Sequence, residues 1–221
     1  MKSQIIITAD GSHTLHIPEL NECYHSRNGA IAESKHIFID AGYRFLSWNK
    51  EHLNILEVGY GTGLNAFLTL IECEKDEKKV NYVAVEPYRI EEKILSKLNY
   101  PDITGSGHHK MFAELHQSVS GVINQLSGNF EIVLIERKIE ETQLQDNGYD
   151  LVYFDAFAPD VQPEMWTPEI FNKLYIAMKD GGILVTYSCK GDVKRALKSA
   201  GFTIEKLPGP LGKREFLRAK K

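Results

Sequence analysis

Five stretches of the chain are nearly continuous in apolar residues, and helical patterns follow the first two. The five stretches are ILEVG (55–59), NYVAVE (81–86), FEIVLIE (130–136), YDLVYFD (149–155) and GGILVTYS (181–188). Strands show this pattern when helices cover both faces of their sheet, because neither face then meets water. The helices predicted after the first two strands are NAFLTLIECE (65–74) and RIEEKILSKL (89–98). The pattern predicts an α/β fold with a mainly parallel sheet.

The N-terminal segment has a different pattern. In residues 4–18, the pair Asp10-Gly11 separates two β-rich runs, which predicts a hairpin. Residues 30–48 carry apolar side chains at helical spacing, which predicts a helix packed on the main domain. These side chains are Ile31, Phe38, Phe45 and Trp48. We therefore expect residues 1–50 to form a hairpin and a helix that pack on a domain of residues 51–221.

The last part of the chain is predicted to complete the sheet. A helix is expected at 192–200, and after it FTIEKL (202–207) and EFLRA (215–219) are predicted to pair in antiparallel fashion. The segment PGPLGKR (208–214) joins them. Together with the five apolar runs, these segments give a sheet of seven strands.

Length and composition suit a globular domain. A chain of 221 residues with 43% hydrophobic and 25% charged residues can bury a sizeable core. It has no apolar run long enough to span a bilayer, and MKSQIIITADG lacks the pattern of a secretory signal, so we expect a cytoplasmic protein. Cys23, Cys73 and Cys189 are odd in number and far apart, which favours reduced cysteines over disulfides or a zinc site.

The net charge of −4 is unevenly distributed. From Lys190 onward, ten Lys and Arg stand against three Asp and Glu, a local balance of +7, and the preceding residues carry −11. A basic face of this kind is typical of proteins that bind nucleic acid. The charges alone favour a solvated amphipathic helix and a polar tail instead. Both interpretations stay open at this point.

Three glycines at alternate positions, Gly59, Gly61 and Gly63, follow the first apolar run. A Gly-rich turn between a strand and a helix usually holds a nucleotide-like ligand, and a structural turn that binds nothing is the alternative. The dinucleotide fingerprint needs a glycine where Leu64 stands, and no Gly-Lys-Ser or Gly-Lys-Thr follows for a phosphate loop. The remaining pattern, with Glu57 two residues before the first glycine, resembles the first motif of the seven-stranded S-adenosylmethionine-dependent methyltransferases. A carboxylate suits a ligand that carries an ammonium and a sulfonium.

Two further acids end predicted strands, where open α/β sheets bind their ligands. Glu86 ends NYVAVE and is expected to accept hydrogen bonds from ribose hydroxyls. Asp155 ends YDLVYFD and precedes AFAPD, at the position where methyltransferases meet the acceptor. An ordinary strand-end acid is the alternative for Glu86.

Several segments together resemble one family, the tRNA 5-methylaminomethyl-2-thiouridine methyltransferases of the bifunctional MnmC-type or stand-alone MnmD-type. The segments are DGSHTL (10–15), YHSRNGAIAESKHIFI (24–39), EVGYGTGLN (57–65), FDAFAPDVQPEMWTPEIF (154–171) and LPGPLGKREFLRA (207–219). The resemblance implies N-methylation of the aminomethyl group of 5-aminomethyl-(2-thio)uridine at the tRNA wobble position. S-adenosyl-L-methionine is then the cofactor and the tRNA anticodon arm the partner.

The chain departs from this family in two respects. IERK (135–138) stands after the third strand where the family has a Gly-Asp pair, so the residue that contacts adenine is unassigned. The flavin-dependent oxidoreductase domain of the bifunctional relatives is not expected within 221 residues. A methyltransferase for a small-molecule amine and a non-catalytic S-adenosylmethionine-binding module are the alternative functions.

The expected site combines the strand ends with the family segments. Asp155 is the expected catalytic residue. The cofactor-binding residues are expected to be Glu57, Gly59, Tyr60, Gly61, Thr62, Gly63, Asn65, Glu86, Pro87, Asp155 and Ala156. The substrate-binding residues are expected to be Tyr24, His25, Phe157, Pro159, Trp166, Lys213 and Arg214.

For several candidate residues, a structural role without ligand contact is the alternative. His25 is as readily a local hydrogen-bonding residue, and tryptophans such as Trp166 are more often core residues. His108 and His109 are expected in a polar loop without partner acids at ligand spacing, so no metal is expected.

Overall fold

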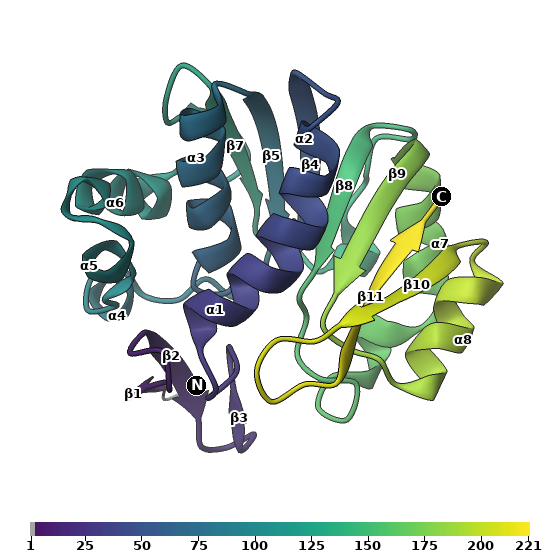
Figure 1. Cartoon of the computed structure of the whole chain (residues 1–221), viewed down its shortest axis with the longest axis horizontal. Helices are drawn as coiled ribbons and strands as arrows, with labels where there is room; N and C mark the ends of the chain where they lie inside the picture. Colours follow the sequence, from purple (N-terminus) through teal and green to yellow (C-terminus); the bar gives the residue numbers. More distant parts are fainter. Residues whose placement is uncertain (1–2) are drawn as a thin grey trace.

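The computed structural model describes residues 3–221, and its centre is a sheet of eight strands (Figure 1). The strands are β4 (His52–Val58), β5 (Lys79–Val85), β6 (Ile123–Gln125), β7 (Phe130–Ile135), β8 (Tyr149–Phe154), β9 (Met178–Thr186), β10 (Thr203–Pro208) and β11 (Glu215–Lys220). Their order across the sheet is β10-β11-β9-β8-β4-β5-β7-β6. The predicted α/β class and all seven predicted strands are confirmed. The eighth strand, β6, is a short antiparallel addition at one edge.

The order of the strands determines where a ligand can bind. β4 pairs in parallel with β5 on one side and with β8 on the other. The strand order therefore reverses beside β4, and the carboxyl ends of strands at such a point border a crevice. β11 runs antiparallel to both β9 and β10, as predicted for the closing pair.

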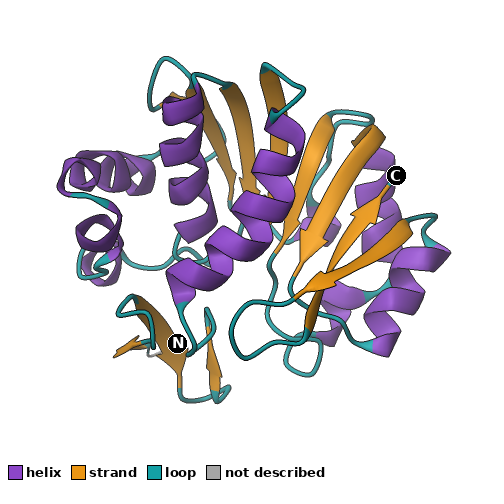
Figure 2. Ribbon diagram, in the orientation of Figure 1, coloured by secondary structure: helices purple, strands orange, loops and turns teal. Residues whose placement is uncertain are grey.

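Helices cover both faces of the sheet (Figure 2). The helical segments are α1 (Ala30–Ser34), η1 (Lys35–Arg44), α2 (Phe45–Ser47), α3 (Leu64–Asp76), α4 (Glu92–Leu95), α5 (Tyr100–Thr104), η2 (Ser106–His108), α6 (His109–Gln117), η3 (Ile139–Glu141), η4 (Pro163–Trp166), α7 (Pro168–Ala177) and α8 (Gly191–Ser199). Two hydrophobic cores result. Along β4, Ile55 faces the core under η1 and α3, whereas Leu56 and Val58 face the core under α7 and α8.

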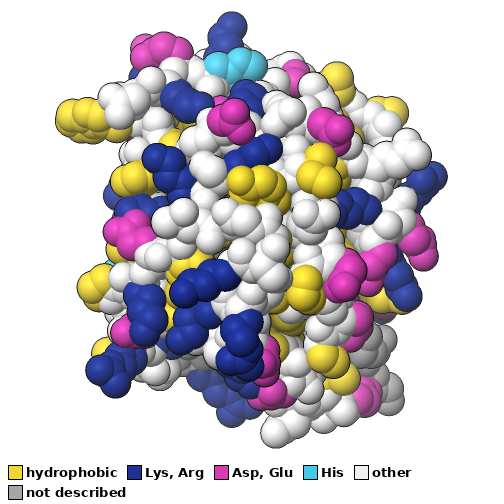
Figure 3. All heavy atoms as spheres, turned by 90° about the vertical axis from the view of Figure 1, so that its right-hand side faces the viewer, with side chains coloured by type: hydrophobic (Ala, Val, Ile, Leu, Met, Phe, Trp, Pro, Cys, Tyr) yellow, Lys and Arg dark blue, Asp and Glu magenta, His cyan; other side chains and the backbone are white. Residues whose placement is uncertain are grey.

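Figure 3 views the side of the molecule that carries α8 and β10, where Lys and Arg side chains gather on one part of the surface. Many of these side chains are paired with acids. Ion pairs join Lys190 to Asp160 and Arg195 to Asp192, and Lys206 lies 3.2 Å from Glu215. The local excess of positive charge is therefore partly neutralised within the protein itself.

The N-terminal segment forms a small sheet of β1 (Gln4–Ile7), β2 (His13–Ile17) and β3 (Glu22–Cys23). The register of β1 with β2 confirms the predicted hairpin, and β3 is a strand that the sequence pattern did not indicate. Residues 1 and 2 of the predicted N-terminal unit lie outside the described residues. The division of the chain at residue 50 stays a prediction.

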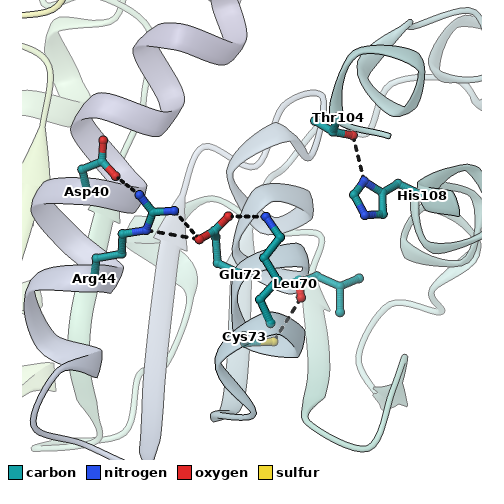
Figure 4. Close-up of polar contacts among 8 residues, drawn as sticks. Asp40, Arg44, Leu70, Glu72, Cys73, Thr104 and His108 are labelled. Carbon is teal, nitrogen blue, oxygen red and sulfur yellow. Dashed lines mark hydrogen bonds and ion pairs between the residues drawn. The ribbon is translucent and has the colours of Figure 1, made fainter. Parts of the chain in front are cut away.

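A long helix of three segments, α1, η1 and α2, follows the small sheet. Arg44 joins it to α3, because its guanidinium bonds Glu72 of α3 (Figure 4). The same guanidinium also bonds Asp40, which lies one turn earlier in η1. The expectation that Phe45 and Trp48 pack on the domain was wrong, since 49% and 87% of these residues are exposed. The reason is that η1 is a π-helix. Its i→i+5 hydrogen bonds change the residues per turn, so Phe45 no longer shares a face with the buried Phe38.

The segment after β5 also differs from prediction. Only α4 is helical within the predicted helix at 89–98. Arg89, which precedes α4, bonds the carbonyls of His116 and Ser118 at 2.7 and 3.1 Å through its guanidinium. The segment expected to be a polar loop is helical, and His109 begins α6. None of the helices in residues 3–221 is long and apolar enough to cross a membrane.

Candidate functional site

A cleft of about 770 Å³ lies at the carboxyl ends of β4, β5 and β8, facing the small N-terminal sheet. Its volume suits a drug-sized or cofactor-sized ligand. The predicted site residues that line it are Tyr24, His25, Gly59, Tyr60, Gly61, Asn65, Glu86, Pro87, Asp155, Ala156, Phe157 and Lys213. The predicted residues that do not line it are Glu57, Thr62, Gly63, Pro159, Trp166 and Arg214. Their roles in binding stay predictions.

The glycine turn is shaped by contacts within the protein. At Gly59, where φ is +91°, an added Cβ would lie 2.5 Å from the Asp155 carbonyl oxygen. At Gly61, where φ is +50°, it would lie 2.9 Å from the Tyr24 ring. Side chains at these positions would strain the backbone. They would also push Asp155, at the end of β8, and Tyr24 away from the loop. The glycines thus allow three segments to meet around the cleft.

A buried hydrogen-bond network connects two of the predicted acids. The Asn65 amide nitrogen donates to Glu57 Oε1 and to Asp155 Oδ2, each at 2.9 Å, and the Tyr82 hydroxyl donates to Glu57 Oε2 at 2.9 Å. The Ser34 hydroxyl donates to Asn65 Oδ1. Because the amide oxygen is occupied by Ser34, both amide hydrogens are directed at the carboxyl groups. The network fixes the orientation of Asp155.

Glu57 lies behind the glycine turn rather than on the cleft. It is fully buried, and burial raises the pKa of its carboxyl well above the ordinary value, with a further contribution from Asp155. A carboxyl in this position holds Asn65 and Tyr82 and presents no charge to the cleft. The expectation that Glu57 contacts a cationic ligand directly is therefore not supported by its position.

Glu86 lies on the cleft and braces the turn. Its Oε2 accepts from the Gly61 backbone N–H at 3.2 Å, and its Oε1 accepts from the Tyr88 N–H at 3.0 Å. Burial raises the pKa of Glu86, against the opposing effect of these two hydrogen bonds. The carboxylate is thus held at the end of β5, with acceptor capacity left for hydroxyl donors.

Asp155 faces the cleft from the end of β8. Burial raises the pKa of its carboxyl to about 7 and Glu33 adds to the increase, while the bond from Asn65 and the charge of Lys213 oppose it. A carboxyl with a pKa near 7 exchanges a proton readily under physiological conditions, which is typical of catalytic groups.

Tyr24 and His25 reach the cleft from the segment after β3. The Tyr24 ring packs edge-on against Phe157, with 5.1 Å between the ring centroids. His25 Nδ1 lies 3.2 Å from Thr14 Oγ1 and Nε2 lies 3.5 Å from Thr62 Oγ1. Burial lowers the pKa of His25 to about 4. The ring is therefore neutral at physiological pH, which favours the local hydrogen-bonding role over contact with a phosphate.

Trp166 lies in the core rather than on the cleft. Its ring packs against Phe154 at 4.9 Å between centroids, and its indole N–H donates to the Phe157 carbonyl at 2.8 Å. Only 5% of the residue is exposed, so its ring has no free face for a base. Trp166 is thus a core residue rather than a surface on which a base can stack. It holds the loop that carries Phe157.

Lys213 and Arg214 point to different environments, although both lie in the turn between β10 and β11. The Lys213 ammonium lies in the cleft, 2.5 Å from Glu33 Oε1 and 4.2 Å from the centroid of the Tyr187 ring. Arg214 is exposed and does not line the cleft. Glu33 neutralises the charge of Lys213 in this structure, so Lys213 is not free for a phosphate contact while the ion pair holds. The substrate-binding role of Lys213 stays a prediction.

Sequence reasoning missed several residues that line the cleft. Tyr187 follows β9, and its hydroxyl donates to the Ala156 carbonyl at 2.9 Å. It lies one residue before the end of the predicted strand GGILVTYS (181–188) and is not an acid, so the signal that identified Glu86 and Asp155 did not select it. Glu33 carried no such signal. After β7, Lys138 and Glu140 line the cleft, whereas Glu136 turns toward Arg89 at 3.5 Å.

The described residues hold no group of three or more His, Cys, Asp or Glu suited to a metal ion. The three cysteines are free thiols. Six Asp or Glu and three Lys or Arg line the cleft, so its chemistry suits a ligand with positive charge and hydroxyl groups better than a polyphosphate.

Comparison with known proteins decides the family. A profile of the S-adenosyl-L-methionine-dependent methyltransferases matches residues 108–221. The chain belongs to this methyltransferase family. S-adenosyl-L-methionine is accordingly its cofactor. The carboxylates and the close backbone turn of the cleft fit this ligand, which carries an ammonium, a sulfonium and ribose hydroxyls.

Curated relatives of the methyltransferase are longer proteins. The chain is 29% identical over 213 residues to the tRNA 5-methylaminomethyl-2-thiouridine biosynthesis bifunctional protein MnmC of Magnetococcus marinus, covering 93% of this chain and 32% of the relative. It is 30% identical over 208 residues to the MnmC protein of Chromohalobacter salexigens, covering 89% of this chain and 30% of the relative. The chain thus spans about a third of the length of these relatives.

Solved structures agree with the fold. The MNMC2 structure from Aquifex aeolicus matches with a TM-score of 0.81 and 25% identity over 99% of this chain and 70% of that chain. Spermidine synthase from Thermotoga maritima matches with a TM-score of 0.55 and 12% identity over 99% of this chain and 71% of that chain, a likeness of fold alone.

Proposed function

We propose that this methyltransferase acts in the cytoplasm on the anticodon arm of tRNA and methylates the aminomethyl nitrogen of 5-aminomethyl-(2-thio)uridine at the wobble position. The observation that carries the proposal is Asp155, a carboxyl that faces the cleft from the end of β8 and is oriented by Asn65. The relatives named for tRNA 5-methylaminomethyl-2-thiouridine biosynthesis support this choice of acceptor.

The cofactor, when bound, supplies a methyl group on a positively charged sulfur. The residues that would hold it are the Gly59 and Gly61 backbone, the Glu86 carboxylate, Pro87 and Ala156. Glu86 suits hydroxyl donors because hydrogen bonds to Gly61 and Tyr88 already fix its two oxygens.

Asp155 serves the acceptor. An amine must be neutral to act as a nucleophile, and positive charge develops on its nitrogen as the new bond forms. The Asp155 carboxylate accepts a hydrogen bond from the amine N–H, directs the nitrogen lone pair and places negative charge where positive charge develops. With a pKa of about 7, it can also take the proton that an ammonium group must lose.

Further hydrogen bonds behind the cleft keep this geometry. Asn65 limits rotation of the Asp155 carboxylate, Tyr187 holds the Ala156 carbonyl, and Trp166 holds the Phe157 carbonyl. Preorganised groups of this kind need no rearrangement as charge develops, which is why they lower the barrier.

The test is nucleoside mass spectrometry on tRNA that carries 5-aminomethyluridine, after treatment with protein and S-adenosylmethionine. We expect the wobble nucleoside to gain one methyl group with wild type, and about a hundredfold slower conversion with Asp155→Asn. A parallel reaction with small primary amines tests the small-molecule alternative. Methylation of these amines with unchanged tRNA would contradict the proposal, and cofactor binding without any methylated product would indicate a binding module.

A further inference from the structure

A lysine from a distant turn fills part of the cleft. Lys213 lies between β10 and β11, and its ammonium contacts Glu33 Oε1 at 2.5 Å and the face of the Tyr187 ring at 4.2 Å. In Figure 1 the same turn extends toward the N-terminal sheet. The carboxylate is well shielded, because only 11% of the Glu33 side chain is exposed.

The two groups that hold this ammonium are fixed by other contacts. Glu33 Oε2 accepts from the Ser26 backbone N–H at 3.0 Å, and the Tyr187 hydroxyl donates to the Ala156 carbonyl at 2.9 Å. The carboxylate and the ring therefore keep their places without Lys213. A carboxylate beside an aromatic face is a general site for an alkylammonium group, since charge pairing and the cation–π attraction act together.

The position of this pair relates it to the acceptor. Glu33, Tyr187, Lys213 and Asp155 all line the same cleft. Glu33 raises and Lys213 lowers the pKa of Asp155, so both charges lie within electrostatic reach of the carboxyl that serves the acceptor. A lysine side chain ends in a primary ammonium on a methylene carbon, which is also the chemistry of a protonated aminomethyl group.

We propose that the Glu33 carboxylate and the Tyr187 ring form the subsite that receives the acceptor's ammonium group, and that Lys213 fills this subsite until the acceptor displaces it. The proposal rests on the proposed function, because it takes the acceptor to be a primary alkylamine. It assigns Glu33 and Tyr187 to acceptor recognition and makes Lys213 an internal competitor.

The test uses n-propylammonium as the probe, titrated by NMR into the full chain with S-adenosylhomocysteine present. Lys213→Met keeps the apolar stem and removes the competing charge, so we expect the ammonium to bind at least about tenfold more tightly than to wild type. The double variant Glu33→Gln/Lys213→Met should lose this gain, while the introduced amide oxygen can still accept from the Ser26 N–H. Lys198→Met, on the exposed part of α8, is the matched control and should behave as wild type.

Methylation kinetics with an aminomethyluridine stem-loop complete the test. We expect KM for this RNA to fall in Lys213→Met and to rise in Glu33→Gln. An unchanged ammonium affinity in Lys213→Met, or a gain that persists without Glu33, would overturn the proposal. If S-adenosylmethionine affinity rose in Lys213→Met and fell in Glu33→Gln, the subsite would belong to the cofactor's own ammonium group. That result would also overturn the proposal. The ammonium titration remains decisive even if the RNA is not methylated, so it separates this proposal from the proposed function.

Discussion

The amide nitrogen of Asn65 lies 2.9 Å from Asp155 Oδ2 and equally 2.9 Å from Glu57 Oε1. Asn65→Ala leaves both carboxyl groups without this donor, and an unsatisfied buried polar group costs about 1–3 kcal/mol. We expect the variant to lose that much stability in urea unfolding and to turn over about a hundredfold more slowly.

The matched control for this prediction is Asn81→Ala. The Asn81 amide donates to Asn54 at 3.0 Å and does not line the cleft, so its loss should reduce stability without a comparable loss of turnover. Wild-type turnover in folded Asn65→Ala would show that the orientation of Asp155 does not depend on this bond.

Gly61→Val should abolish cofactor binding while the sheet remains folded. The residue has φ of +50°, and an added Cβ would lie 2.9 Å from Tyr24, so a β-branched side chain strains the turn and displaces Tyr24. Calorimetry with S-adenosylmethionine measures the effect, and circular dichroism checks the fold. Gly128→Val is the control, because nothing lies within 4 Å of a Cβ at that position. Equal cofactor affinity in both variants would refute the assignment of the loop.

Asp155 should make the stability of the protein depend on pH. Its pKa is about 7 in the folded chain against an ordinary value of 3.8, so the folded state binds the proton more tightly than the unfolded state. The free energy of unfolding contributed by Asp155 therefore falls as pH rises from about 4 to about 7, and then levels.

Asp155→Asn removes this penalty. We expect the variant to be more stable than wild type at pH 8 by about 1–3 kcal/mol, with little difference at pH 4. Urea unfolding at both pH values measures the effect. A stability difference that is the same at both pH values would contradict the raised pKa.

Arg214 and Lys213 should differ in their effect on tRNA binding. Arg214 is exposed and has no ion pair within residues 3–221, whereas Lys213 is neutralised by Glu33. If Arg214 contacts a phosphate, Arg214→Ala should weaken binding across tRNA sequences and flatten the slope of log affinity against log salt by about one unit. With tRNA that lacks the aminomethyl group, the Glu33–Lys213 ion pair is retained, so Lys213→Ala should leave this slope unchanged. Titrations of tRNA at several salt concentrations measure the slope, and the exposed Lys110→Ala on α6 is the control. Equal slopes for wild type and all variants would rule out a phosphate contact of Arg214.

The parts of the fold that were predictable depend on local pattern. Continuous apolar runs identified the strands of the main sheet, and acids at strand ends identified Glu86 and Asp155 as residues on the cleft. Even the burial of Glu57 had a local signal. Alternate residues of a strand share a face, and Glu57 shares the face of Ile55, which packs under η1 and α3.

The rest depended on long-range contacts or unusual backbone geometry. The exposure of Phe45 follows from the π-helical segment, which no spacing of apolar residues reveals. Within the helix expected at 89–98 only α4 forms, and Arg89 contacts carbonyls in and after α6 that lie 27 and 29 positions away in the sequence. Glu33 has its partner, Lys213, at the opposite end of the sequence, so only the folded chain identifies it as a cleft residue.

The turn between β10 and β11 meets the first helix of the chain, where His36 bonds the Pro208 carbonyl across 172 positions of sequence. Contacts of such separation form late, because the loop they close costs the most entropy. On the ribosome, the glycine turn and Glu86 emerge well before Pro208 and Lys213. The part of the cleft that β4 and β5 provide is therefore synthesised early, whereas the part that Glu33 shares with Lys213 waits for the final strands. Slow refolding steps should accordingly delay acceptor recognition more than cofactor binding.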